Sequence, residues 1–245
     1  MSCAIAVTSG KGGTGKTSLT GGVASCLAAL GNEVLCIDMD IGLRNLDISL
    51  GMTDRVLMDF TDVIEGRCTL QRAAAKHPVI EHLSLLTAPL SLSPRVTEEG
   101  VAALLREAKG QYDYVLMDSP AGLGLGFRLA VCGADRAIVV STTDNSALRD
   151  AQRVVTELSR ELGHIHLVMN KVRPKLLKRL HTTIDDAMDA AGLPLLGVVP
   201  DDEQVLLAAN LGKPVILTSR KGAALAYLNI ARRLMGERIP LMHLR

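Results

Sequence analysis

Short runs of apolar residues alternate along the chain with longer stretches in which apolar positions recur every three or four residues. The short runs are typical of buried strands, and the longer stretches are typical of amphipathic helices. The predicted strands cover residues 4–8, 34–38, 83–87, 114–118, 137–141, 165–170 and 195–200. The predicted helices cover residues 17–30, 146–162, 183–191 and 203–211, and they are followed by Gly31, Gly163, Gly192 and Gly212. Glycine at that place commonly ends a helix.

This alternation of strands and helices predicts an α/β fold, with a single doubly wound, mainly parallel sheet flanked by helices. Ligands of such sheets bind outside the carboxyl ends of the strands, so we expect the functional residues directly after the predicted strands. The 245 residues contain no repeat, low-complexity segment or linker. We therefore expect one domain over residues 1–245, with a short C-terminal tail over residues 236–245.

A glycine-rich segment with the pattern G-x-x-x-x-G-K-T lies between the first predicted strand and the first predicted helix. This is the pattern of a P-loop, in which backbone N–H groups and the positive end of a helix dipole surround a phosphate. Lys16 is expected to neutralise the β- and γ-phosphates of the nucleotide, and the Thr17 hydroxyl to bind Mg²⁺. The candidate nucleotide-binding residues are Gly10, Lys11, Gly12, Gly13, Thr14, Gly15, Lys16 and Thr17.

Lys11 is a second cation in this loop, at a position that the general P-loop pattern leaves free. Because Lys16 already serves the bound nucleotide, we expect Lys11 to reach a nucleotide held by a facing subunit. There its ammonium group would meet the charge that develops on the transferred phosphoryl group, which would couple dimerisation to hydrolysis. The alternative is that Lys11 is an ordinary solvated lysine.

Two aspartates, Asp38 and Asp40, lie at the end of the second predicted strand. Alternate residues that leave a strand point to opposite sides, so only one of the two faces the phosphates directly. Asp40 is the candidate for orienting the attacking water. Asp38 is the candidate for holding a Mg²⁺-bound water or pairing with a P-loop lysine. The two roles could be exchanged, and capping of a following helix is the alternative for each residue.

The predicted strand at residues 114–118 ends at Asp118, which is the Walker B pattern and suits an outer-sphere contact with Mg²⁺. Gly122 follows, and its backbone N–H would approach the γ-phosphate, so we expect the stretch up to Gly126 to become ordered with ATP. No Glu or Gln follows Asp118 directly. We therefore expect an ATPase, converting ATP and water to ADP and phosphate, that is slow unless a partner or a second subunit completes the site.

The composition narrows the classes of function. A net charge of +1 gives no global field that would collect nucleic acid or anionic lipid, and 2% aromatic residues leave few platforms for stacking bases. No apolar run is long enough to cross a bilayer and no basic leader precedes the first strand, so we expect a cytoplasmic protein. The cysteines form no C-x-x-C pair, and we expect free thiols at Cys3, Cys26, Cys36, Cys68 and Cys132.

Three segments resemble the deviant Walker A (MinD/ParA) P-loop ATPases, and among them the MinD family. They are the P-loop itself, the acidic stretch at residues 38–47 and the Asp-Ser-Pro-Ala-Gly stretch at residues 118–122. Later segments at residues 148–153, 195–202 and 212–215 extend the resemblance over nearly the whole chain. The Ile-Gly-Leu-Arg-Asn-Leu-Asp part of the acidic stretch favours MinD over flagellar-number and plasmid-partition relatives.

This resemblance implies a homodimer with ATP in which Lys11 acts across the interface, Asp40 activates water and Asn45 supports the switch. Arg44 would help to present a partner-binding surface, and an ordinary ion pair with Asp47 is the alternative. The family also implies a role in placing the division septum. Its ATP dimer binds the membrane and recruits a MinC-like division inhibitor. Release would come from a MinE-like activating peptide or from a polar-positioning protein.

The residues after the predicted strand at 165–170 indicate which base is bound. A guanine site of the N-K-x-D type needs an acidic fourth residue, and Arg173 occupies that position. The Asn170 carboxamide can pair with the adenine edge, so we expect ATP rather than GTP. A turn role is the alternative for Asn170. By the resemblance, Pro200 and Asp201 would form the second wall of the adenine site.

The C-terminal tail departs from the family, whose members usually end in a basic amphipathic helix. Here five residues follow Pro240, and they offer Leu241, Met242 and Leu244 as membrane anchors beside one arginine. Such a segment is too short to form a stable helix in water. Weak association with the inner face of the cell membrane, through two tails on one dimer, is therefore a hypothesis.

A basic segment without any acid consists of Lys171, Arg173, Lys175, Lys178 and Arg179. Such a run is typical of a solvated loop and helix start, and the alternative is a patch for duplex DNA or anionic lipid. The competing functions are a DNA-associated ParA-like positioning ATPase, an electron-transfer relative of nitrogenase reductase and a scaffold that binds ATP without turnover. We do not expect nucleic acid as the partner.

Overall fold

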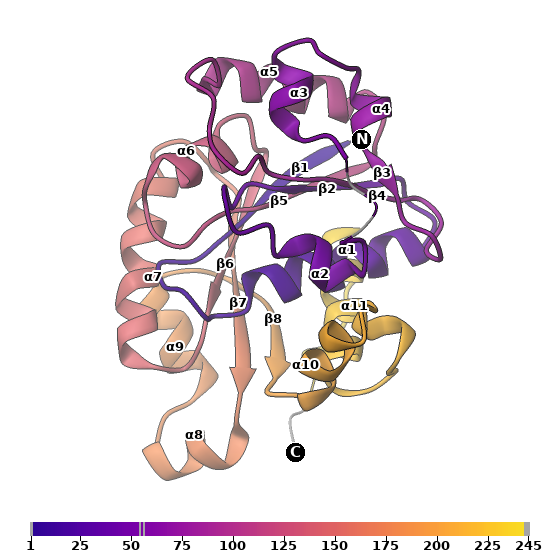
Figure 1. Cartoon of the computed structure of the whole chain (residues 1–245). Helices are drawn as coiled ribbons and strands as arrows, with labels where there is room; N and C mark the ends of the chain where they lie inside the picture. Colours follow the sequence, from indigo (N-terminus) through magenta and orange to yellow (C-terminus); the bar gives the residue numbers. More distant parts are fainter. Residues whose placement is uncertain (1, 54, 56, 243–245) are drawn as a thin grey trace.

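The computed structural model describes residues 2–53, 55 and 57–242 (Figure 1). Within these residues the strands form an eight-stranded sheet in the spatial order β3-β4-β2-β5-β1-β6-β7-β8. The strands are β1 (Cys3–Thr8), β2 (Val34–Asp38), β3 (Ala75–Lys76), β4 (Leu83–Leu86), β5 (Tyr114–Asp118), β6 (Arg136–Ser141), β7 (Ile165–Val172) and β8 (Leu195–Pro200). Neighbouring strands are parallel except β3 and β4, which confirms the predicted fold class.

Helices cover both faces of this sheet (Figure 1). They are α1 (Lys16–Ala29), α2 (Leu46–Leu50), α3 (Phe60–Ile64), α4 (Leu70–Ala73), α5 (Glu98–Lys109), α6 (Leu125–Val131), α7 (Asn145–Leu158), α8 (Pro174–Leu180), α9 (Ile184–Ala191), α10 (Glu203–Asn210) and α11 (Gly222–Leu234), with a 3₁₀ turn η1 (Val215–Leu217). None of the helices seen in the described residues combines the length and the apolar character that a bilayer crossing requires.

Two apolar cores lie on the two faces of the sheet. One core contains Leu105 of α5 and Val154 of α7, and the other contains Leu27 of α1 and Tyr227 of α11. Strands between two helical layers are buried on both faces, which explains why the sequence shows them as continuous apolar runs. This arrangement leaves the ends of the strands as the place where polar groups reach the surface.

The strand order brings three loops together at one edge of the sheet. β1 lies between β5 and β6, and β2 lies on the other side of β5. In the parallel register Asp38 of β2 is the partner of Asp118 of β5, and Asp118 is in turn the partner of Val7 of β1. The P-loop after β1 and the acidic loops after β2 and β5 therefore meet, as the sequence predicted.

The element boundaries differ from the prediction where the signal is short or local. The antiparallel strand β3 has only two residues, which is too few for a hydrophobic pattern to detect. The predicted helix at 146–162 ends at Leu158, because residues 159–161 form turns before Gly163. The strand predicted at 165–170 continues to Val172. The short helices α2, α3, α4, α6 and α8 were not predicted, since four to seven residues carry little periodicity. The longer helix α5 was not predicted either, although its buried positions recur at helical spacing.

Close packing of α1 against α11 depends on Gly22. Tyr227 is 1% exposed, and a Cβ atom built on Gly22 would overlap its ring carbons. Glycine costs helix stability relative to alanine, so its presence in the interior of α1 has a packing reason. The missing side chain is what lets the tyrosine ring lie directly on the backbone of α1.

A buried histidine connects the helix α2 with the hairpin of β3 and β4. The Nδ1 atom of His77 accepts hydrogen bonds from the backbone N–H groups of Val79 and Ile80, at 3.1 and 2.9 Å. The proton therefore resides on Nε2, which donates to the carbonyl oxygen of Leu50 at 3.0 Å. Burial lowers the pKa of His77, and the hydrogen bond to Leu50 acts in the opposite direction.

Gly22→Ala should destabilise the protein by about 1–3 kcal/mol, because overpacking at the Tyr227 ring outweighs the better helix propensity of alanine. Urea unfolding followed by circular dichroism measures this change. The control is Gly163→Ala, where no atom lies within 4 Å of the added Cβ. Equal stability of Gly22→Ala and the wild type would show that α11 adjusts freely.

The lowered pKa of His77 predicts a loss of stability in acid. The unfolded chain binds a proton near the ordinary value of 6.5 while the folded chain does not, so this contribution is complete above pH 6.5 and declines below it. His77→Ala should cost about 1–3 kcal/mol at pH 7.5, because the Leu50 carbonyl loses its partner. The cost should be smaller at pH 5.5. His164→Ala, at an exposed position, is the control, and a cost that is independent of pH would contradict the assignment.

Candidate functional site

The P-loop has the open shape that a phosphate cradle needs. Gly13 and Gly15 have φ angles of 79° and 86°, which are favourable only for glycine. No atom lies within 4 Å of a Cβ built on Gly12 or Gly13, so one side of the loop faces open space. Helix α1 begins at Lys16, and its positive end points at this loop. The predicted phosphate-binding residues are thus brought together in a shape that fits an anion.

Lys16 is 8% exposed, which is unusual for a lysine. Burial lowers the pKa of its ammonium group, and the nearby carboxylates of Asp118 and Asp40 act in the opposite direction. The Lys16 side chain is therefore held between the ends of β2 and β5, where it would meet phosphate oxygens above the loop. This placement agrees with the role predicted for it.

Asp118 lies at the bottom of the site. It is 1% exposed, and burial raises its pKa to about 7, while hydroxyl groups of Thr17 and Thr20 act against this rise. The Thr20 hydroxyl donates to Oδ1 of Asp118 at 3.2 Å. A buried carboxylate beside the Thr17 hydroxyl offers oxygen ligands of the kind that Mg²⁺ prefers, with room for phosphate and water as its other ligands. The residues present therefore fit a magnesium–nucleotide complex.

Asp38 is fully buried, and both of its carboxylate oxygens accept backbone hydrogen bonds. Oδ1 accepts from the N–H of Asp40 at 2.8 Å, and Oδ2 accepts from the N–H of Leu46 at 3.1 Å. Burial raises its pKa to about 6, against the lowering effect of these two bonds. Asp38 therefore fastens the two ends of the loop at residues 39–46. This contact resembles the capping alternative more than the predicted pairing with a lysine.

Asp40 is half-buried and is the aspartate of this pair whose charge acts on Lys16. Burial raises the pKa of Asp40, and the Lys16 ammonium group lowers it. Asn45 is exposed at the start of α2, and its side chain makes no capping hydrogen bond. The structure thus places Asp40 beside the phosphate site and Asn45 at its outer margin.

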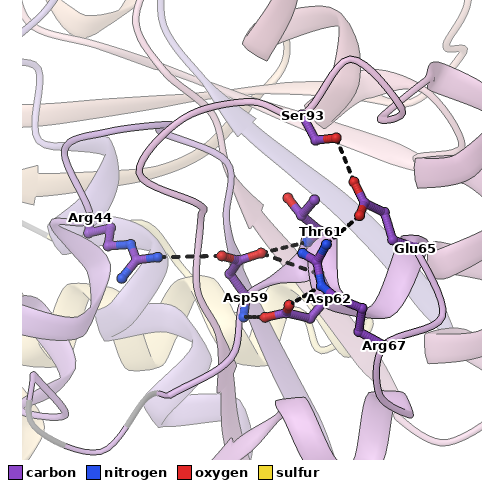
Figure 2. A network of polar contacts seen from close by, with 7 residues as sticks. All are labelled: Arg44, Asp59, Thr61, Asp62, Glu65, Arg67 and Ser93. Carbon is purple, nitrogen blue, oxygen red and sulfur yellow. Dashed lines mark hydrogen bonds and ion pairs between the residues drawn. The ribbon is translucent and has the colours of Figure 1, made fainter.

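Arg44 links the loop at residues 39–46 to other parts of the chain (Figure 2). Its Nε donates to the carbonyl oxygen of Ala88 at 2.6 Å, and its guanidinium group lies 3.5 Å from the Asp59 carboxylate. The ion pair with Asp47 that the sequence left open is therefore replaced by one with Asp59. Its φ of 47° is uncommon for an arginine and shows that the loop is bent to make these contacts.

Asp59 belongs to a polar network around the start of α3 (Figure 2). Asp59 and Asp62 form a capping box, and Arg67 bridges Asp62 and Glu65. Glu65 in turn accepts a hydrogen bond of 2.5 Å from the Ser93 hydroxyl. The network connects Arg44 to the loop after β4, which sequence reasoning did not anticipate because its members are far apart in the chain.

Lys11 projects from the loop toward α7. Its side chain is exposed, and its Nζ donates to the Ser146 hydroxyl at 3.0 Å. Gly10 lies so close to the backbone of Asp150 that a Cβ atom would overlap it. The start of the P-loop is therefore packed on α7, and Lys11 lies at the outer rim of the site rather than inside the loop.

Gly122 is tied to the chain directly after β1. Its backbone N–H, which was predicted to approach the γ-phosphate, donates to the carbonyl oxygen of Ser9 at 3.1 Å. If this N–H donated to a phosphate, its bond to Ser9 would be replaced. Its φ of 87° shows that glycine is needed at this turn.

The predicted base-binding residues lie at the ends of β7 and β8. Asn170 is 3% exposed, and its Nδ2 donates to the carbonyl oxygen of Thr14 at 2.8 Å, so its carboxamide is engaged inside the protein. Pro200 and Asp201 line a cavity of about 910 Å³, together with Arg173. Asp201 accepts a hydrogen bond of 2.5 Å from the Arg173 guanidinium. Adenine recognition by Asn170 stays a prediction.

A family model described as the CobQ/CobB/MinD/ParA nucleotide binding domain matches residues 5–215 of this chain. Septum site-determining protein MinD of Bacillus subtilis (strain 168) is 42% identical over 246 residues, covering 98% of this chain and 92% of that protein. The protein of the same name from Synechocystis sp. is 39% identical, covering 99% of this chain and 92% of that protein.

Solved structures give the same result. The MinC:MinD cell division protein complex of Aquifex aeolicus contains a chain that superimposes with a TM-score of 0.92 and 38% identity, covering 99% of each chain. MinD of Pyrococcus horikoshii, complexed with Mg-ADP, superimposes with a TM-score of 0.83 and 28% identity over 96% of each chain. The chain therefore belongs to the CobQ/CobB/MinD/ParA nucleotide-binding family, and within it to the MinD septum site-determining proteins.

Proposed function

We propose that this chain is an ATP-dependent dimerising switch that helps to place the division septum by recruiting a division inhibitor. The observation that carries the proposal is that two lysines of one loop have different surroundings. Lys16 is buried between Asp40 and Asp118, whereas Lys11 extends outward to the rim at Ser146. Lys16 would serve the nucleotide of its own subunit, and Lys11 would serve a nucleotide that approaches from outside.

The cofactors are ATP and Mg²⁺, in keeping with the P-loop ATPases of this family and with the Mg-ADP named for the relative from Pyrococcus horikoshii. Bound Mg²⁺ would supply charge neutralisation between the β- and γ-phosphates. Thr17 would hold it directly, and Asp118 would act through a water. Lys16 would bind the β- and γ-phosphates, and Asp40 would orient the attacking water.

The contacts around the loop at residues 39–46 support a switch. Asp38 fixes both ends of this loop, so a shift at Asp40 would be passed on to α2 through Leu46. In the loop after β5, the N–H of Gly122 would give up its bond to Ser9 and donate to the phosphate instead. Both loops would then respond to the presence of the γ-phosphate.

A partner of the MinC type is proposed from the MinC:MinD complex of Aquifex aeolicus, whose MinD chain this protein resembles over 99% of its length. A MinE-like activating peptide or a polar-positioning protein would stimulate hydrolysis. Arg44, held by Ala88 and Asp59, would contribute to the surface that changes with nucleotide. We further propose that residues 1–245 act as one unit.

Weak membrane association is proposed for the C-terminal tail, in a more restricted form than the sequence indicated. Arg233 donates to the carbonyl oxygens of Ile239 and Pro240, at 3.0 and 2.7 Å, and so holds the start of the tail on the body. Met242 packs against the apolar core, whereas Leu241 is 46% exposed. Leu244 lies outside the described residues. Leu241 is thus the described anchor that is available to lipid.

The dimer is tested by size-exclusion chromatography with light scattering, in ATP and in ADP. The wild type should form a dimer in ATP only, and its specific ATPase activity should rise with protein concentration. Asp40→Ala should keep the dimer and lose turnover, and Lys11→Ala should lose both, with turnover reduced at least about tenfold. Lys76→Ala, at an exposed position on β3, is the control. A wild type that stays monomeric in ATP and hydrolyses it at a constant specific rate would refute the proposal.

Co-sedimentation with anionic liposomes tests the tail. The full chain should bind weakly in ATP and less in ADP, because two tails on one dimer act together. Leu241→Glu should reduce the bound fraction several-fold, while Leu217→Glu, at a residue 44% exposed outside the tail, should not. If neither ATP nor the substitution changes the bound fraction, the tail is not the anchor.

A further inference from the structure

The end of β7 contacts the P-loop at three consecutive carbonyl groups. The ammonium group of Lys171 donates to the carbonyl oxygen of Gly13 at 2.8 Å. The Nδ2 atom of Asn170 donates to the carbonyl oxygen of Thr14 at 2.8 Å and lies 3.5 Å from that of Gly15. In Figure 1 the loop between β1 and α1 passes beside β7, so these two neighbours on one strand reach along the loop.

The backbone of β7 is shaped to make these contacts. Its pairing with β8 shifts register between Met169 and Val172, which is where the strand bulges. Lys171 has a φ of 53°, a conformation that L residues rarely adopt. The backbone N–H of Lys171 also donates to Oδ1 of Asn170 at 2.9 Å, which fixes the carboxamide with its Nδ2 toward the loop. The bulge thus turns both side chains to the P-loop.

Peptide geometry converts these contacts into an orientation of N–H groups. In a planar trans peptide the carbonyl of one residue and the N–H of the next point in opposite directions. Carbonyl groups held toward β7 at Gly13 and Thr14 therefore direct the N–H groups of Thr14 and Gly15 to the opposite side. That is the side on which a P-loop surrounds phosphate. The carbonyl of Gly15 also accepts the first hydrogen bond of α1, from the N–H of Leu19 at 3.0 Å.

The hydrogen bonds of the described residues agree with this orientation. Neither Thr14 nor Gly15 donates its backbone N–H to a protein atom there, and the N–H of Lys16, as the first residue of α1, has no partner within the helix. The same loop thus has its carbonyl side satisfied by β7 and its N–H side available to an anion.

We propose that Asn170 and Lys171 are positioning residues that hold the P-loop in its anion-binding shape from the carbonyl side. The proposal rests on the proposed function only in that the loop binds nucleotide phosphates. It gives Asn170 a role in addition to the predicted base reading, because its bonds to Thr14 and Lys171 leave one lone pair of Oδ1 free. Lys171 and Lys178 of the same basic segment are both exposed, and only Lys171 of the two contacts the loop.

The first test measures binding of Mg-ADP and of sodium pyrophosphate by isothermal titration calorimetry of the full chain. Lys171→Met should weaken both probes about tenfold, because a charged donor to the loop is lost. Lys171→Arg, which keeps a charged donor, should stay within about threefold of the wild type. Lys178→Met, at an exposed position of the same basic segment, is the control and should change neither affinity. Asn170→Ala should weaken both probes like Lys171→Met, with its melting temperature recorded to exclude unfolding.

The second test separates positioning from a simple loss of positive charge. Hydrogen–deuterium exchange of the peptide covering residues 9–19, measured without nucleotide, should be faster in Lys171→Met than in the wild type. Lys178→Met, which removes the same charge without touching the loop, should exchange as the wild type does. In steady-state turnover, the KM for ATP should rise about tenfold in Lys171→Met while kcat changes less than threefold.

Four results would overturn the inference. Unchanged pyrophosphate affinity in Lys171→Met, with weaker ADP binding, would place the lysine at the nucleoside instead. If hydrogen–deuterium exchange of the peptide at residues 9–19 is the same in Lys171→Met and the wild type, Lys171 acts on phosphate binding only through its charge. A wild type that binds neither probe would remove the proposed function together with this inference. By contrast, a wild type that binds both while Lys171→Met and Asn170→Ala bind equally well would remove the inference alone.

Discussion

The ammonium group of Lys16 occupies a nearly dry position, and the loss of water around it is offset by the carboxylates of Asp118 and Asp40. These carboxylates lie at the ends of two different strands, so the parallel order of β1, β5 and β2 is what makes a buried lysine stable there. Burial raises the pKa of the Asp118 carboxyl group, and the Lys16 ammonium group acts against this rise. The buried charges of the site thus stabilise one another. A Mg²⁺–triphosphate complex would add a cation near the carboxylates and an anion near the lysine.

The loops around this charge cluster are fastened by a few well-defined contacts. Asp38 closes the loop after β2 through two backbone N–H groups, and Arg44 joins that loop to Ala88 and Asp59. Gly122 ties the loop after β5 to Ser9. Contacts of this kind have two discrete arrangements, made or exchanged, so they are suited to report whether a phosphate is present.

The two sides of the P-loop contact different parts of the protein. Its outer rim rests on α7, where Lys11 meets Ser146 and is directed away from its own site. Its carbonyl side rests on β7, where Asn170 and Lys171 hold the loop. A rigid support on one side and an outward lysine on the other would allow a second subunit to act on a nucleotide that is already correctly held.

Seven of the eight strands, the P-loop and the positions of Asp40 and Asp118 near strand ends could be predicted from the sequence, because apolar periodicity and glycine spacing are local properties of the chain. Which partners the polar groups take became visible only in the folded chain. Asn170 donates to Thr14, 156 residues away, and Arg44 pairs with Asp59 instead of its neighbour Asp47. Such partners follow from how distant segments pack, since a buried polar group takes whichever partner the fold brings within reach.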